Sequence, residues 1–181
     1  MTDDIKKRLD VVLVAGGKYH DIDFARLELL KLLAEDDRIR TRVYEDYSNL
    51  HAISNADFLI TYTCDVRPTL EQQKVLRDFV ANGKRWLALH GTNSILQFLS
   101  DGRVDCPRVA PIFMETLGSQ FLSHPPIEPY TVTVADGDHH LVEGVEPFET
   151  NDELYLMETH GELHVLLETE FEGNTPGFVE E

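Results

Sequence analysis

The stretch DVVLVA at residues 10–15 is an unbroken apolar run after its first aspartate, and Gly16 and Gly17 end it. Apolar runs without polar alternation are typical of parallel strands that helices cover on both faces. A leucine-rich segment at residues 23–35 follows and predicts a helix. This strand–turn–helix unit indicates an α/β fold.

The same unit recurs along the first ninety residues. Further strands are expected at residues 40–45, 58–63 and 85–90. Between the last two, Thr69 and Gln72 have the spacing of a helix capping box, and Gly83 marks the end of the helix. These alternations predict an open, mostly parallel α/β sheet with helices on both faces.

The pattern is weaker after Gly91. Short helices are expected at residues 92–99 and 112–117, on either side of a polar loop at residues 100–111. Strands are expected at residues 130–135, 154–157 and 165–168. The last residues, FEGNTPGFVEE, have the composition of a surface loop.

The composition is that of one globular domain. The chain has 181 residues, of which 42% are hydrophobic and 27% charged. It contains no apolar run of the roughly 18 residues that a membrane span needs, and no apolar leader at its N-terminus. Two cysteines are too few for a disulfide framework. We therefore expect a reduced, cytoplasmic protein that does not bind membranes.

The net charge of -17 is unevenly distributed. Residues 1–108 carry all 16 Lys and Arg residues against 17 acids, whereas residues 109–181 carry 16 acids and no Lys or Arg. This charge disfavours nucleic acid and anionic membranes as partners, because both attract basic proteins. The acidic segment suits a solvated surface, a site for a partner or metal, or an interface between copies of the chain.

Polar residues and glycines follow three of the predicted strands where each strand ends. They are Gly16, Gly17 and His20 after the first, Thr63, Cys64 and Asp65 after the third, and His90, Gly91 and Thr92 after the fourth. Ligands of open α/β sheets bind beyond the carboxyl ends of the strands. We therefore expect these residues to converge on one edge of the sheet.

His90 occupies the turn between a buried strand and an expected helix, where α/β enzymes often place a nucleophile. A histidine there is a candidate general base, metal ligand or oxyanion stabiliser. The same position also suits a histidine that packs at a strand end and bonds to the backbone.

Three further residues are candidates on local grounds. His20 follows two glycines that permit close approach of a ligand, and His124 lies in the rigid loop SHPPI. Glu153 is a candidate general acid/base or metal ligand, or else a solvated acid. A glycine interrupts the spacing of His160 and His164, so we do not expect a helical metal pair there.

Six motifs occur in a characteristic order along the chain. They are GGKYHD from Gly16, TLEQQKVLRDFVANG from Thr69, LALHG from Leu87, GSQFLSHPPI from Gly118, DHHLVEGV from Asp138 and NDELY from Asn151. This order resembles the ThuA-like (trehalose-utilisation) family from about Val11 to Leu167. The resemblance implies the class I glutamine amidotransferase-like fold, which is related to flavodoxin-like sheets.

The resemblance also bears on the site and on the extent of the domain. The amidotransferases carry a nucleophilic cysteine at the position of His90, so thiol-based glutamine hydrolysis is expected to be absent. The positions characteristic of the family are Gly17, His20, His90, Gly91, His124, Pro125 and Glu153. The family continues into a further hairpin, a strand and an LGH motif, so we expect a single ThuA-like domain over residues 1–181 that lacks its closing strand and helix.

By resemblance, the chain functions in disaccharide catabolism, beside dehydrogenases that make 3-keto sugars. We predict a keto-sugar lyase, hydrolase or isomerase with His90, His20 and Glu153 as catalytic residues. The predicted substrate-binding residues are Gly17, Gly91, Thr92, Thr63 and His124. A divalent metal, Zn or Mn, is predicted at His20, His90 and His124, and the expected partners are a small-molecule sugar and copies of the chain in a homo-oligomer. The alternative is a non-catalytic sugar-binding or regulatory module.

Overall fold

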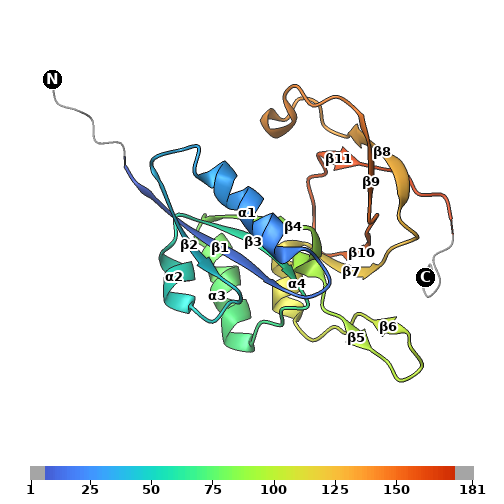
Figure 1. The fold of residues 1–181 in the computed structure, drawn as a ribbon, viewed down its shortest axis with the longest axis horizontal. Coiled ribbons are helices and arrows are strands. Elements are labelled where there is room, and N and C mark those ends of the chain that lie inside the picture. Colours follow the sequence, from blue (N-terminus) through green and yellow to red (C-terminus); the bar gives the residue numbers. More distant parts are fainter. Residues whose placement is uncertain (1–6, 174–181) are drawn as a thin grey trace.

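A computed structural model describes residues 7–173 of the chain. Its first part alternates strands and helices (Figure 1). These elements are β1 (Leu9–Gly17), α1 (Ile22–Leu33), β2 (Ile39–Tyr44), α2 (Leu50–Asn55), β3 (Phe58–Cys64), α3 (Leu70–Ala81) and β4 (Arg85–Leu89). All four strands that the sequence pattern predicted here are present, and each lies within two residues of its expected bounds.

The four strands form one parallel sheet in the order β2-β1-β3-β4. In the register of β1 and β3, Val12 lies beside Leu59, and Leu13 lies beside Ile60. Val12 and Leu59 pack against helices α2, α3 and α4 (Pro111–Leu117) on one face, while Leu13 and Ile60 pack against α1 on the other. The prediction of an open, parallel α/β sheet with helices on both faces is confirmed.

The helix starts follow the capping signals in the sequence. Asp21 caps α1 by accepting a hydrogen bond from the backbone N–H of Phe24. Thr69 and Gln72 form the predicted capping box at the start of α3. The sequence pattern missed α2, because six residues are too few to show a helical period.

The chain after β4 is built from shorter elements. They are η1 (His90–Asn93), β5 (Gln97–Phe98), β6 (Val104–Asp105), α4 (Pro111–Leu117), β7 (Ser119–Ser123), β8 (Glu128–Val134), η2 (His140–Val142), β9 (Phe148–Asp152), β10 (Leu156–Thr159) and β11 (Leu167–Glu168). β7 pairs with β10, and β8 lies between β9 and β11, in two small antiparallel sheets. Figure 1 shows these sheets on one side of the parallel sheet, beyond β4.

Two predictions for this part are wrong. Residues 92–99 form no α-helix: a 3₁₀ turn is followed by an extended segment in which Ile95 is buried. The Thr92 hydroxyl donates to the Leu89 carbonyl and holds that tight turn. The expected polar loop at residues 100–111 contains β6, which pairs with β5 as a hairpin. The pattern also missed β7 and β9, since neither has a clear two-residue period.

The segment from β8 to the end of the described chain, which we call the second part, has little core of its own. Among residues 128–173, Val142 alone is buried. Within the described part of the chain, no helix is long and apolar enough to cross a membrane. The loop expected at the end of the sequence lies mostly outside the described residues, from 174 onward.

Candidate active site

Three residues with strained backbones mark the carboxyl edge of the parallel sheet. Tyr19 follows β1 with a φ of 71°, Asp65 follows β3 with a φ of 55°, and His90 follows β4 with a φ of 45°. Side chains other than glycine rarely adopt such positive φ values, and residues that do so cluster at functional sites. The strain therefore points to this edge as the site.

His20, His90 and Glu153 meet at this edge. The Nε2 atoms of His20 and His90 lie 3.1 Å apart, and Oε2 of Glu153 lies 3.3 Å from the first and 3.2 Å from the second. The sheet places both imidazoles, whereas Glu153 follows β9 and is 133 residues away from His20 in the sequence. The convergence that we predicted for His20 and His90 is thus present, and Glu153, a candidate on local grounds, lies with them; we call these three residues the His–Glu triangle.

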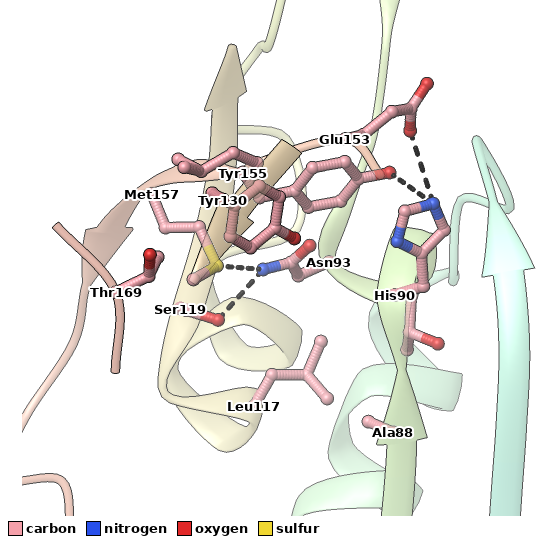
Figure 2. Close-up of a pocket in the computed structure, with 12 residues that line it drawn as sticks. Ala88, His90, Asn93, Leu117, Ser119, Tyr130, Glu153, Tyr155, Met157 and Thr169 are labelled. Atoms are coloured by element: carbon pink, nitrogen blue, oxygen red, sulfur yellow. Dashed lines mark hydrogen bonds and ion pairs between the residues drawn. The ribbon is translucent and has the colours of Figure 1, made fainter. Parts of the chain in front are cut away.

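His90 is held between two tyrosine rings. The ring of Tyr155 stacks on it with a centroid distance of 4.5 Å, and the ring of Tyr62 stacks on it at 6.0 Å. The Tyr155 hydroxyl lies 3.1 Å from Nε2 of His90 (Figure 2). Burial and the nearby Glu153 carboxylate raise the pKa of Tyr155, so its hydroxyl keeps its proton at neutral pH. Sequence analysis missed this role, and the only signal was its place in NDELY.

The His20 imidazole is neutral at pH 7. Burial lowers its pKa, and the neighbouring His90 lowers it further, although Glu153 opposes both effects. Its Nδ1 atom is buried and has no hydrogen-bond partner among residues 7–173. A neutral imidazole can offer the lone pair of Nε2 to a cation in the triangle.

The triangle has the dimensions of a tetrahedral metal site. Two ligand atoms bound to zinc at 2.0–2.1 Å are about 3.3–3.4 Å apart in tetrahedral geometry. The three atoms of the triangle are 3.1–3.3 Å apart, and in the described part of the chain only this set of His, Cys, Asp and Glu side chains brings three donors within 4.8 Å of one another. Two imidazoles and a carboxylate also suit zinc chemically.

His124 stands next to the triangle rather than in it. Its Nε2 lies 3.8 Å from Oε1 of Glu153, the carboxylate oxygen that faces away from His20 and His90. Its Nδ1 donates to the carbonyl of Pro125 at 2.7 Å, which leaves the lone pair on Nε2. Glu153, rather than His124, thus contributes the third atom of the triangle.

The remaining predicted binding residues lie around the triangle in other roles. A methyl group on Gly91 would lie 3.0 Å from Cε1 of His20, and one on Gly17 would lie 1.9 Å from the Cys64 carbonyl oxygen. Thr63 is buried and shares a hydrogen bond with Tyr47. Thr92 is buried against Leu89, as described above. Both glycines permit close packing under the site, and both hydroxyls are satisfied inside the protein.

Two cavities meet at Glu153 and Tyr155. The larger, of about 820 Å³, is also lined by His20 and His124 and extends to the β5–β6 hairpin. The smaller, of about 390 Å³, is lined by Ala88 and His90 on one side and by Ser119 and Met157 on the other (Figure 2). We call the larger cavity the cleft, since its volume is in the range of small-molecule sites.

Neither cysteine has the environment of a nucleophile. Burial raises the pKa of Cys64 to about 12 and that of Cys106 to about 11. Both thiols are therefore protonated at neutral pH, although Cys64 lines the cleft.

A second group of histidines lies away from the sheet edge. His139 contacts His140 and His164, and His164 pairs with Asp136 at 2.7 Å. Within residues 7–173, these side chains do not bring three ligand atoms together as the triangle does. The segment from His160 to His164 lies outside the helices of the described chain.

Two solved structures of other proteins have a similar fold. A ThuA-like protein from Bacteroides uniformis has a similar structure, with a TM-score of 0.69, 17% identity and coverage of 91% of this chain and 69% of that one. A ThuA-like protein from Parabacteroides merdae gives a TM-score of 0.61 at 17% identity, covering 90% of this chain and 68% of that one. At this identity the likeness establishes the fold. Among curated proteins, none matches the sequence.

The family comparison covers nearly the whole chain. The model of the ThuA family, described as trehalose utilisation, matches residues 10–179. That range contains every residue of the His–Glu triangle and of the cleft. The chain belongs to the ThuA family, which is linked to trehalose utilisation.

Proposed function

We propose that this protein is an enzyme of sugar catabolism that acts on a sugar carrying a carbonyl group. The observation that carries the proposal is the His–Glu triangle, in which two imidazole nitrogens and one carboxylate oxygen lie 3.1–3.3 Å apart. The family link to trehalose utilisation supports a sugar as the substrate. The protonated thiols support a reaction without a cysteine nucleophile, so we propose that glutamine hydrolysis is absent.

Packing alone is a poor explanation for the triangle. Partly burying two imidazoles and a carboxylate costs free energy of desolvation, which must be offset by their mutual contacts. The buried Nδ1 of His20 without a partner adds to that cost. Polar groups that are strained and incompletely satisfied are typical of sites selected for function.

We propose in addition that the triangle holds a divalent cation, zinc or manganese. Nε2 of His20, Nε2 of His90 and Oε2 of Glu153 would be its protein ligands, beside the cleft that His20 and Glu153 line. Such a cation would act as a Lewis acid on the carbonyl oxygen of the substrate.

His124 is then the best placed general base. Oε2 of Glu153 is shared by two imidazoles, whereas Nε2 of His124 faces the cleft with its lone pair free. A carbonyl acidifies the neighbouring C–H, and His124 would take that proton. The C–H electron pair forms an enolate, and Oε1 of Glu153, 3.8 Å away, stabilises the imidazolium.

Tyr155 completes the chemistry on the substrate side. Its protonated hydroxyl would donate a hydrogen bond to the enolate oxygen. In a 3-keto-glycoside the enolate can expel the glycosidic oxygen at C1, which takes the proton from His124 and leaves as an alcohol. Return of the proton to C3, with the O2 proton passing to O3, gives the 2-keto isomer instead. Both outcomes begin with the same proton abstraction.

Hydrogen exchange tests that common step. The protein is incubated with methyl 3-keto-α-glucopyranoside in D₂O with added Zn²⁺ or Mn²⁺, and proton NMR follows loss of the C2 proton above the rate without enzyme. We expect exchange in the wild type, and a loss of roughly 100-fold or more in His124→Asn because the base is removed. His124→Asn should keep the bound metal, whereas Glu153→Gln should lose metal and exchange together.

Two results would contradict this scheme. Full exchange in His124→Asn would move the base to Glu153. Absence of exchange in the wild type with either metal, together with sugar binding that survives His90→Ala, would indicate the non-catalytic binding module.

A further inference from the structure

Two exposed aromatic rings stand together on the rim of the cleft. The rings of Tyr19 and Phe98 have centroids 5.6 Å apart and an interplanar angle of 47°. Their exposed fractions are 57% and 58%, although both residues line the same cleft as His124 and Glu153. They come from different elements, Tyr19 from the loop after β1 and Phe98 from strand β5.

Both rings are held in place by the backbone beneath them. Tyr19 adopts its strained φ of 71° between two anchored neighbours: the Lys18 N–H donates to the Cys64 carbonyl at 3.0 Å, and His20 belongs to the triangle. Phe98 lies in a hairpin that is closed by the N–H of Leu99 donating to the Arg103 carbonyl at 2.8 Å. An exposed aromatic side chain at a strained backbone position indicates a function at that position.

We propose that Tyr19 and Phe98 form a subsite for the second pyranose ring of a glycoside. The proposal deepens the proposed function, and rests on it for the first ring, which would lie at the His–Glu triangle. The C–H groups on one face of a pyranose make an apolar surface that packs on aromatic rings, while its hydroxyls need polar partners at the edge. The side chains of Arg103 and Asp105 line the cleft beside Phe98 and can supply those partners.

The size and shape of the cleft agree with an occupant of two rings. The cleft has a volume of about 820 Å³ and extends from the triangle to the β5–β6 hairpin. The aromatic pair lines this cleft together with Tyr155, whose hydroxyl contacts His90. A one-ring sugar bound at the triangle would leave the pair uncovered, whereas a disaccharide would cover it.

Calorimetric titration of the full chain separates one-ring from two-ring ligands. The ligands are trehalose, methyl α-glucopyranoside and glucose, none of which needs to react. We expect trehalose to bind most tightly, and Tyr19→Ala and Phe98→Ala each to weaken its binding by roughly three- to tenfold, as loss of an aromatic contact predicts. Both variants should leave the affinity for methyl α-glucopyranoside unchanged, and Tyr19→Phe should retain the affinity for trehalose.

Phe24→Ala is the matched control. Phe24 is 62% exposed, it lies on α1, and it does not line the cleft. Circular dichroism establishes that each variant is folded, and Tyr19→Leu replaces Tyr19→Ala if that variant is not folded.

Equal binding of one-ring and two-ring ligands by the wild type would overturn the subsite. So would a loss in Phe24→Ala as large as in Tyr19→Ala, or no binding of trehalose at all. Each of these results leaves the proposed function to its own readout, because deuterium exchange uses a one-ring substrate.

Discussion

The parallel sheet and the second part of the chain, residues 128–173, differ in how they are stabilised. Strands β1 and β3 bury Val12, Leu13, Leu59 and Ile60 almost completely, between helices on both faces. The second part, from β8 to the end of the described chain, buries one side chain, that of Val142. It also belongs to the segment that carries no Lys or Arg.

The site nevertheless needs both parts. The parallel sheet places His20 and His90, whereas the β9–β10 connection supplies Glu153 and Tyr155. A buried core holds its side chains in fixed positions, whereas a weakly packed segment can move and contact a ligand at a small cost in free energy. The parallel sheet therefore supplies most of the stability, whereas both parts supply residues of the site.

The largest effect is expected in the core of the parallel sheet. Leu59→Ala should lower the free energy of unfolding by about 2–5 kcal/mol, because Leu59 is 0% exposed and its loss leaves a cavity. Leu167→Ala in β11 should cost less than about 1 kcal/mol, since Leu167 is 39% exposed. Urea denaturation followed by circular dichroism measures both. Equal costs would show that the second part has a core that its burial does not reveal.

The next largest effect is expected at Glu153, the proposed metal ligand that the second part supplies. Glu153→Ala should weaken Zn²⁺ or Mn²⁺ binding by more than about 100-fold, because loss of a direct ligand exceeds loss of an outer-shell partner. Elemental mass spectrometry of tag-free protein, purified without chelator, measures the bound metal. Glu149→Ala is the control, because Glu149 is an exposed acid in β9, the strand that precedes Glu153. Metal retained in Glu153→Ala, or absent from the wild type, would contradict the proposed site.

Gly91 lies close to His20 at the edge of the parallel sheet. A methyl group there would lie 2.9 Å from the Thr63 carbonyl oxygen and 3.0 Å from Cε1 of His20. Gly91→Ala should therefore displace the imidazole and lower metal affinity by roughly tenfold, with a loss of about 1–3 kcal/mol in stability from overpacking. Gly137→Ala, whose added carbon would meet nothing closer than 4.0 Å, should change neither quantity. If the two variants behave alike, the close packing under His20 does not matter for the site.

The first part of the molecule could be predicted from sequence because local signals decide it. The run at residues 10–15, the capping box of Thr69 and Gln72, and the glycines at strand ends each specify structure within a few residues. The edge that gathers His20 and His90 then follows from topology, since parallel strands end on the same side.

The second part could not be predicted to the same degree because long-range packing decides it. The position of Glu153 depends on how the chain returns to His20 across 133 residues. Whether Thr63 and Thr92 face a ligand or the interior depends on partners such as Tyr47 and Leu89, which no local pattern identifies. Tyr155 has the same composition signal as any aromatic residue of a core, so only the structure reveals its contact with His90.

The smallest effect is expected at Asp65, in the loop that follows β3. Burial alone would raise the pKa of Asp65, but hydrogen bonds from Lys18, the Leu96 N–H and Arg67 outweigh it and lower the pKa. A carboxylate with a lowered pKa stabilises the fold above its ordinary pKa of 3.8, and that contribution is lost as the pH falls through the lowered value. Asp65→Asn should thus cost about 1 kcal/mol at pH 7, because its cationic partners are partly exposed, and progressively less below pH 3.8. Urea titrations between pH 7 and pH 3 measure this difference, with the exposed Asp138→Asn as control; a pH-independent cost would mean that Asp65 acts through its shape and hydrogen-bond geometry rather than through its charge.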